Sequence, residues 1–220
     1  MIKPATRSLA AILFLTGASA VNAQKAASPA DLPFIGSVSA ADPRAEAAGM
    51  AMLKRGGSAT DAAIATMLAL TVVEPQSSGI GGGGFLVRGA ADGSVETVDG
   101  RETAPMGATP DWFLNADGSV PPFMDSVLSG LSVGVPGNIA LAAEAHARHG
   151  TLPWAVLFEP AIELARDGFP INVRLAQSLT QSRDRAAANE GGRALFYDDQ
   201  GRPLPAGTLV RNPELARTFE

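Results

Sequence analysis

The hydrophobic pattern predicts a first helix after Asp42. In "DPRAEAAGMAMLKRGG", Asp42 is a suitable N-cap and Pro43 suits the first helical position. An alanine-rich body follows, with basic residues in the last turn and Gly56 after it. These start and stop signals agree with one another, so the segment is predicted to be helical from Pro43 to Arg55, with Gly56 as the stop.

The next segment, "SATDAAIATMLALTVVEP", predicts a second helix that is buried. Ser58 and Asp61 form a shortened relative of the capping box, and Pro75 marks the end. Residues 62–73 are apolar nearly all round, which is typical of a helix in the middle of a protein. Because such a helix needs covering layers, we expect exposed apolar surface wherever those layers are missing.

Alternating patterns predict three strands. "FIGSVSA", residues 34–40, is the first. "FLVRGAADGSVETVDGRE" reads as two strands joined at residues 91–94, where the Asp92-Gly93 pair supplies a hairpin turn.

Three further helical segments are predicted in the second half of the chain. One runs from Pro136 to Gly150, and another from Pro153 to Gly168, where Pro160 should cause a kink or leave two short helices. The last begins at Asn212 and Pro213.

The N-terminus has the pattern of a secretory signal. Lys3 and Arg7 precede a short apolar run, residues 9–15, and small residues lead to Ala23. We expect a signal peptide at residues 1–23 and an exposed leader at 24–33, with an uncut anchor as the alternative. The protein would then be periplasmic or secreted.

Composition and charge exclude several classes of function. The 220 residues contain 17 basic and 22 acidic side chains, and removal of the signal peptide would leave 15 and 22, a net charge of −7. Nucleic-acid binding is therefore disfavoured. The sequence has no cysteine, which excludes a thiol nucleophile and a cysteine-based zinc site.

Glycines 79, 81, 82, 83 and 84 form the most unusual stretch, "SSGIGGGGFLVRG". A phosphate loop follows a strand and opens a helix, whereas here the predicted order is helix, glycines, strand, and no Lys-Ser or Lys-Thr pair follows Gly84. The favoured interpretation is a turn that lets another backbone or a ligand approach closely.

Other candidate sites have simpler explanations. Ser77 and Ser78 lack the preceding glycine of a hydrolase elbow and suit a turn. His146 and His149 are three residues apart on a predicted helix, but no metal site is predicted, because histidines in a last turn complement the helix dipole. The acidic row at residues 159, 163 and 167 is typical of a solvated helix face.

Arg101, in "VDGRETAP", stands at the end of the third predicted strand. An arginine there is well placed to bind a carboxylate through two parallel hydrogen bonds. An ordinary surface ion pair is the alternative interpretation.

Four blocks of the sequence together resemble the large subunit of the γ-glutamyltranspeptidases, also called glutathione hydrolases. In order, they are "ADPRAEAAGMAMLKRGGSATDAAIATMLALTVVEPQSSGIGGGGFLVR", "VDGRETAP", "GVPGNIALAAEAHARHG" and "PAIELARDGFPIN". The resemblance runs from about Val38 to the C-terminus. Four blocks in the same order are far more specific than one glycine run.

The resemblance implies an α+β fold, namely an incomplete αββα sandwich of the N-terminal-nucleophile hydrolases, mostly helical with a β-hairpin. Residues 34–220 would be the N-terminal part of a large subunit, made as an exported precursor that cuts itself. In that family, the N-terminal threonine of the small subunit attacks a γ-glutamyl amide, and the acyl group passes to water, an amino acid or a peptide. No cofactor is implied.

By resemblance, Arg101 binds the α-carboxylate of the glutamyl group and Glu102 supports that arginine. The expected substrate is glutathione or another γ-glutamyl compound, and the expected partner is the remaining region of the precursor with its small subunit. The family's Thr-Thr-His type processing stretch is absent from these 220 residues, so we expect the chain alone to be inactive.

Two other functions remain open at this stage. A related acylase, which cleaves cephalosporin, glutaryl or poly-γ-glutamyl amides, would share these blocks. A non-catalytic exported binding domain is the alternative from a different class.

Overall fold

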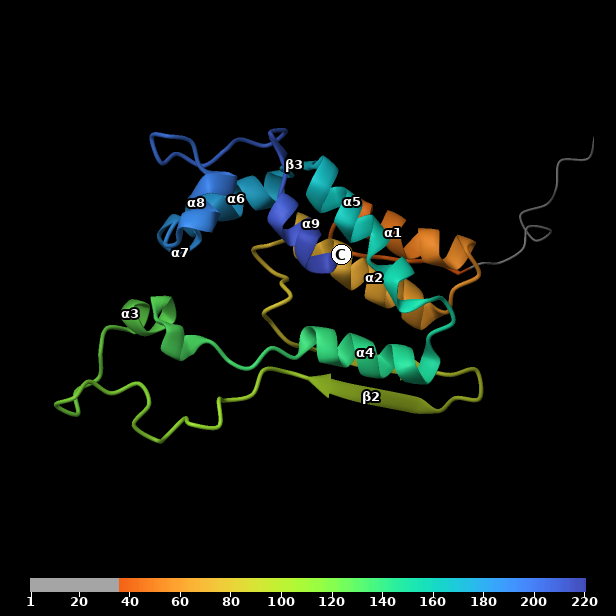
Figure 1. Ribbon diagram of the computed structural model, residues 1–220, viewed down its shortest axis with the longest axis horizontal. Helices are drawn as coiled ribbons and strands as arrows, with labels where there is room; N and C mark the ends of the chain where they lie inside the picture. Colours follow the sequence, from red (N-terminus) through yellow and green to blue (C-terminus); the bar gives the residue numbers. More distant parts are fainter. Residues whose placement is uncertain (1–35) are drawn as a thin grey trace, which may run out of the picture. The chain divides into compact units, whose positions relative to one another are not determined.

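The structure, a computed structural model, describes residues 36–220 (Figure 1). The predicted signal peptide and leader lie outside these residues. The longer helices and the hairpin strands are α1 (Pro43–Lys54), α2 (Ala59–Val73), β1 (Gly84–Gly89), β2 (Val95–Gly100), α4 (Asn138–His149), α5 (Glu159–Asp167), α6 (Val173–Gln181) and α9 (Pro213–Phe219). Shorter elements are α3 (Phe123–Leu128), η2 (Gly130–Ser132), η3 (Trp154–Leu157), β3 (Phe169–Pro170), α7 (Arg183–Ala186), α8 (Glu190–Phe196) and β4 (Leu209–Val210).

The first two helices form as their local signals predict. The Asp42 side chain caps α1 by accepting a hydrogen bond from the backbone N–H of Arg44. Ser58 and Asp61 make a complete capping box at the start of α2. Both predictions are confirmed. The physical reason is that each cap binds N–H groups that the first turn of a helix leaves without a partner.

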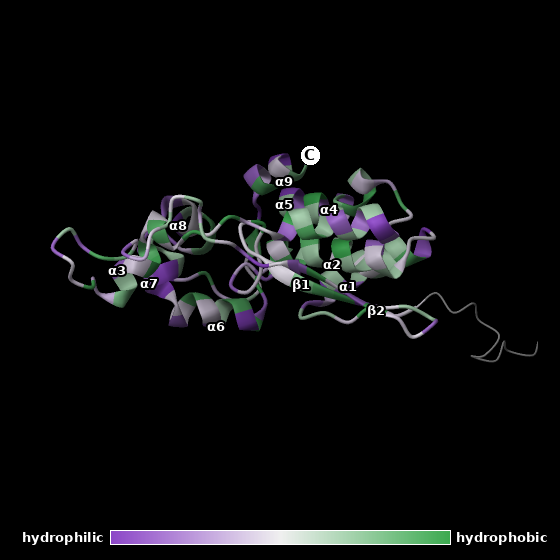
Figure 2. Cartoon of the chain, turned by 90° about the horizontal axis from the view of Figure 1, so that it is seen from below, coloured by the Kyte–Doolittle hydropathy of each residue, from purple (hydrophilic) through white to green (hydrophobic). Residues whose placement is uncertain are grey.

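Helix α2 is the centre of the core, and its hydrophobic composition is visible in Figure 2. It packs against α1, α4, η3 and α5. Its burial is as predicted, but the exposed apolar side chains lie elsewhere. Most are on the outer face of the hairpin, where Phe85, Val87 and Val95 are exposed, and in the segment between β2 and α4.

The hairpin is confirmed with its predicted turn. Strands β1 and β2 pair in antiparallel register from Gly84↔Gly100 to Gly89↔Val95. Gly93 has a φ of 84°, the left-handed conformation that this turn requires. Helix α4 lies along the hairpin (Figure 1), which places the end of β2 beside the start of α4.

The predicted first strand at residues 34–40 is wrong over its described part. Residues 36–40 alternate between half-buried and exposed positions, as a strand does, but they pair with no other strand in the described chain. Strand formation needs a ladder partner, which an alternating pattern alone does not supply. A short sheet that was not predicted joins β3 to β4.

The later helices follow the proline and glycine signals closely. Helix α4 begins at Asn138, two residues after Pro136. The segment containing Pro160 forms two short helices, η3 and α5, with the proline in the first turn of α5. Helix α9 starts at Pro213 with Asn212 as its cap. Within residues 36–220, no helix is long and apolar enough to cross a membrane.

Candidate functional site

Arg101 directly follows β2, and its side chain remains accessible. The side chain is 54% exposed, and its Nη1 donates a hydrogen bond to the carbonyl oxygen of Gly83 at 3.3 Å. Its backbone N–H donates to the carboxylate of Asp99 at 2.9 Å. The main chain of Arg101 is thus fixed, while its guanidinium retains donors for a ligand.

Glu102 lies beside Arg101 and is more buried. Its Oε2 is 3.0 Å from Nη2 of Arg101, and its side chain is 26% exposed. The two groups are close enough for an ion pair, but no donor among residues 36–220 has hydrogen-bond geometry toward this Oε2. The carboxylate therefore lies next to the guanidinium but accepts none of the guanidinium's hydrogen bonds.

Both side chains line an open pocket of about 670 Å³. One wall is the chain that follows Arg101 and includes Trp112 and Phe113. The other wall is residues 131–134. Trp112 Nε1 connects the two walls by donating a hydrogen bond of 2.9 Å to the carbonyl oxygen of Leu131. An accessible arginine that lines such a cavity can bind an anionic group of a small molecule.

The glycine run connects α2 to β1 and is held by the start of α4. The side-chain amide of Asn138 donates to the carbonyl oxygen of Gly79 at 2.7 Å. The backbone N–H groups of Gly137 and Asn138 both donate to the carbonyl oxygen of Gly82, at 3.0 and 3.1 Å. The run is followed by strand β1 and not by a helix, so it lacks the helix N-terminus that the phosphate-loop interpretation requires.

The five glycines of the run differ in how much space surrounds them. A Cβ on Gly83 would lie 2.5 Å from the carbonyl oxygen of Gly100 and 2.7 Å from the backbone nitrogen of Glu102. Around Gly79 and Gly81 no such atom lies within 4 Å. Close backbone approach is therefore needed at Gly83, where the loop touches the chain that carries Arg101.

The remaining sequence candidates do not join this site. His146 Nε2 donates a hydrogen bond to the carbonyl oxygen of Leu152 at 2.8 Å, and His149 Nε2 contacts Glu96 Oε2 at 2.6 Å. The two imidazoles thus have separate partners, and no cluster of metal-ligating side chains occurs in residues 36–220. In the acidic row, residues 159, 163 and 167 are exposed, in agreement with the solvated face that was predicted.

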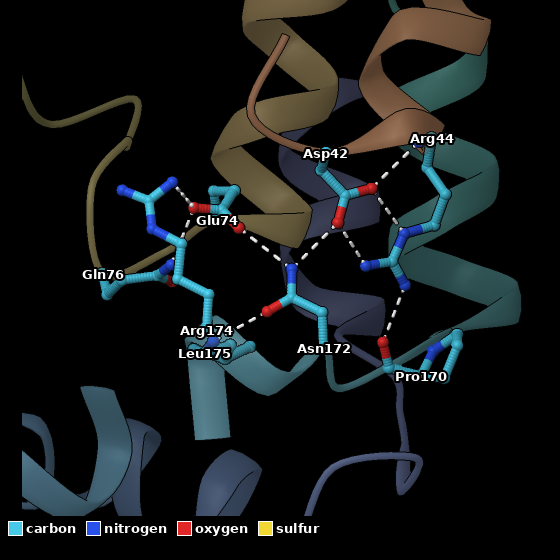
Figure 3. Close-up of polar contacts among 8 residues, drawn as sticks. All are labelled: Asp42, Arg44, Glu74, Gln76, Pro170, Asn172, Arg174 and Leu175. Atoms are coloured by element: carbon cyan, nitrogen blue, oxygen red, sulfur yellow. Dashed lines mark hydrogen bonds and ion pairs between the residues drawn. The ribbon is translucent and has the colours of Figure 1, made fainter. Parts of the chain in front are cut away.

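A buried polar network lies near the start of the glycine run and was not predicted. Asn172 Nδ2 donates to Oδ2 of Asp42 and to Oε1 of Glu74, both at 3.0 Å (Figure 3). The two carboxylates are each only 1% exposed. Residues separated by 130 and 98 positions meet here, so a local pattern cannot reveal the contact; the only local signal is that Asn172 suits the N-cap of α6.

Arg44 stabilises the charge on Asp42. Its guanidinium donates to both carboxylate oxygens, at 2.7 and 2.6 Å, and to the carbonyl oxygen of Pro170 at 2.7 Å. Burial alone would raise the pKa of Asp42, but hydrogen bonds from Arg44 and Asn172 outweigh it and lower the pKa below its ordinary value.

Comparison with known proteins identifies the family. The sequence profile of the family Gamma-glutamyltranspeptidase matches residues 45–220. The chain belongs to this family. The glutathione hydrolase proenzyme of Bacillus subtilis is 40% identical over 188 residues, which are 84% of this chain and 31% of that protein.

Solved γ-glutamyltranspeptidase structures share the fold. The enzyme from Helicobacter pylori is 35% identical with a TM-score of 0.79, over 84% of this chain and 53% of that chain. The cephalosporin acylase of Bacillus halodurans is 33% identical with a TM-score of 0.66, over 80% of this chain and 33% of that chain. The chain thus spans about a third of the curated relative and about half of the H. pylori chain.

The predicted fold class is confirmed by these relatives. The described residues are α+β, mostly helical with two small antiparallel sheets, and match part of a γ-glutamyltranspeptidase of the N-terminal-nucleophile hydrolase fold. Their coverage fits the N-terminal part of the large subunit.

Proposed function

We propose that this chain supplies the substrate-carboxylate site of an enzyme that cleaves γ-glutamyl amides, such as glutathione. Arg101 carries the proposal: it lines a pocket of about 670 Å³, its side chain is 54% exposed, and its backbone is fixed. In this role, two N–H groups of Arg101 bind the α-carboxylate of the glutamyl group. Glu102 orients the guanidinium from the side.

The bond-breaking chemistry is proposed to come from another part of the same precursor. An N-terminal threonine of the small subunit attacks the γ-carbonyl, its own amine takes the hydroxyl proton, and the amine leaving group departs with a proton. Water or an amino acid then takes the acyl group from the threonine ester. No threonine of the 220 residues is assigned this role, and the chain alone is proposed to be inactive.

Export to the periplasm or the medium is part of the proposal. The pattern of residues 1–23 supports it. Membership of a family that includes glutathione hydrolases favours an enzyme over a non-catalytic binding domain.

The test uses the complete, matured enzyme and the Arg101→Ala variant. The KM for a γ-glutamyl anilide should rise on the order of 100-fold, because a charge-assisted bidentate pair is lost. Arg202→Ala is the matched control, since Arg202 is exposed and paired only locally with Asp198 and Gln200. An unchanged KM in Arg101→Ala would show that Arg101 does not bind the substrate.

An acylase is the second candidate, favoured by the similarity to the cephalosporin acylase. A glutaryl group keeps the carboxylate of a γ-glutamyl group but lacks its α-amine, so Arg101 could bind either. The ratio of kcat/KM for γ-glutamyl and glutaryl anilides separates the two functions. A ratio well above one supports the γ-glutamyl enzyme, and a ratio below one supports the acylase.

A further inference from the structure

Glu74 carries a buried carboxylate where a helix does not favour one. It is the C-cap residue of α2, and its side chain is 1% exposed. The C-terminal end of a helix dipole is negative, so an anion there is destabilising unless other groups compensate it. The stability of α2 therefore does not account for this glutamate.

Three donors from two parts of the chain compensate the charge (Figure 3). Asn172 Nδ2 donates to Oε1 at 3.0 Å, and Gln76 Nε2 donates to Oε2 at 2.7 Å. Arg174 forms an ion pair with Oε2 at 2.9 Å. Both carboxylate oxygens are hydrogen-bonded or ion-paired, which fixes the orientation of Glu74 and of the turn that contains Gln76.

The same residue fixes the start of the glycine run. The carbonyl oxygen of Glu74 accepts hydrogen bonds from the backbone N–H groups of Ser77 and Ser78, both at 2.9 Å. Arg174, held by the Glu74 carboxylate, also approaches Ser77 Oγ at 3.3 Å. The backbone of Glu74 and, through Arg174, its side chain thus both contact the residues that enter the run.

The other end of the run contacts the proposed carboxylate site. Gly83, the fifth residue after Ser78, accepts the hydrogen bond from Arg101 Nη1. We propose that Glu74, held by Asn172 and Arg174, is a positioning residue: it sets the glycine run so that Gly83 orients the Arg101 guanidinium. This inference rests on the proposed function of Arg101 and adds to it a residue that acts through Arg101.

The experiment is a double-mutant cycle in the complete, matured enzyme, with a γ-glutamyl anilide as the substrate. Glu74→Gln keeps the side-chain shape and removes the charge. It should raise KM about tenfold with kcat within about twofold, because Arg101 is displaced and not removed. In the Arg101→Ala background, Glu74→Gln should add less than about twofold to KM. Glu214→Gln, at an 84% exposed glutamate of α9, is the control and should leave both constants unchanged.

The possible outcomes separate the proposed function of Arg101 from the positioning role of Glu74. If Arg101→Ala leaves KM unchanged, the proposed function is wrong and this inference fails with it. If Arg101→Ala raises KM and Glu74→Gln multiplies KM equally in both backgrounds, only the inference is overturned. If the Glu74→Gln enzyme does not fold, Arg174→Gln takes its place, because Arg174 is 57% exposed; a raised KM there supports the positioning role, and an unchanged KM overturns it.

Discussion

The side-chain amide of Asn138 donates a hydrogen bond of 2.7 Å to the carbonyl oxygen of Gly79, which precedes it by 59 residues. Asn138 is the first residue of α4, and its backbone N–H binds the carbonyl oxygen of Gly82. One buried residue thus holds the glycine run at two points. The start of α4 thereby fixes the loop that lies beside Arg101.

Asn138→Asp should destabilise the protein. The variant removes the donor and places a carboxylate against the Gly79 carbonyl oxygen, and the favourable helix dipole offsets only part of that repulsion. We expect the free energy of unfolding to fall by about 1–2 kcal/mol in urea denaturation. Asn189→Asp is the matched control, because the Asn189 side chain caps α8 as an acceptor and aspartate keeps that role. Equal stability of the two variants would contradict the assigned contact.

Gly83→Ala should be more harmful than Gly81→Ala. A Cβ at Gly83 would lie 2.5 Å from the carbonyl oxygen of Gly100, so the backbone must move, whereas a Cβ at Gly81 meets no atom within 4 Å. Overpacking of this kind costs about 1–3 kcal/mol. Thermal melting of both variants measures the difference, and a Gly83→Ala protein as stable as Gly81→Ala would show that the loop adapts freely.

The contribution of Asp42 to stability should depend on pH. Its pKa is lowered in the folded protein, so its charged form stabilises the fold above the ordinary pKa of 3.8, and that contribution is lost as the pH falls through the lower folded value. Asp42→Asn keeps an N-cap acceptor but removes the charge. At pH 7 it should reduce the free energy of unfolding by about 1–3 kcal/mol, from lost hydrogen bonds to a charged group.

The difference between wild type and Asp42→Asn should shrink as the pH falls below 3.8. Urea denaturation at a series of pH values measures it. Asp199→Asn serves as the control, since Asp199 is exposed and its carboxylate accepts no hydrogen bond from residues 36–220. A difference that stays constant down to pH 2 would contradict the assigned ionisation of Asp42.

Features with local causes could be predicted from the sequence. The caps of α1 and α2, the Asp92-Gly93 turn and the break at Pro160 each depend on residues within a few positions of one another. The position of Arg101 directly after β2 also agrees with the sequence pattern, because the hairpin fixes where that strand stops. Its role as a carboxylate site remains a prediction.

Features that depend on distant residues could not be predicted. Residues 36–40 alternate like a strand, but pairing is a property of two segments, and the described chain offers no second one. Asn172 lies 98 positions from Glu74, so neither residue indicates the other. The space around each glycine likewise depends on the chain that packs against it, which distinguishes Gly83 from Gly81 only in three dimensions.

Binding of the substrate carboxylate by Arg101 is tested most directly with two competitive inhibitors of the complete, matured enzyme. L-glutamate carries the α-carboxylate, and 4-aminobutanoate is the same molecule without it. We predict that the wild-type enzyme binds L-glutamate about 100-fold more tightly than 4-aminobutanoate, and that Arg101→Ala abolishes this preference. A preference for L-glutamate that persists undiminished in Arg101→Ala would contradict the account.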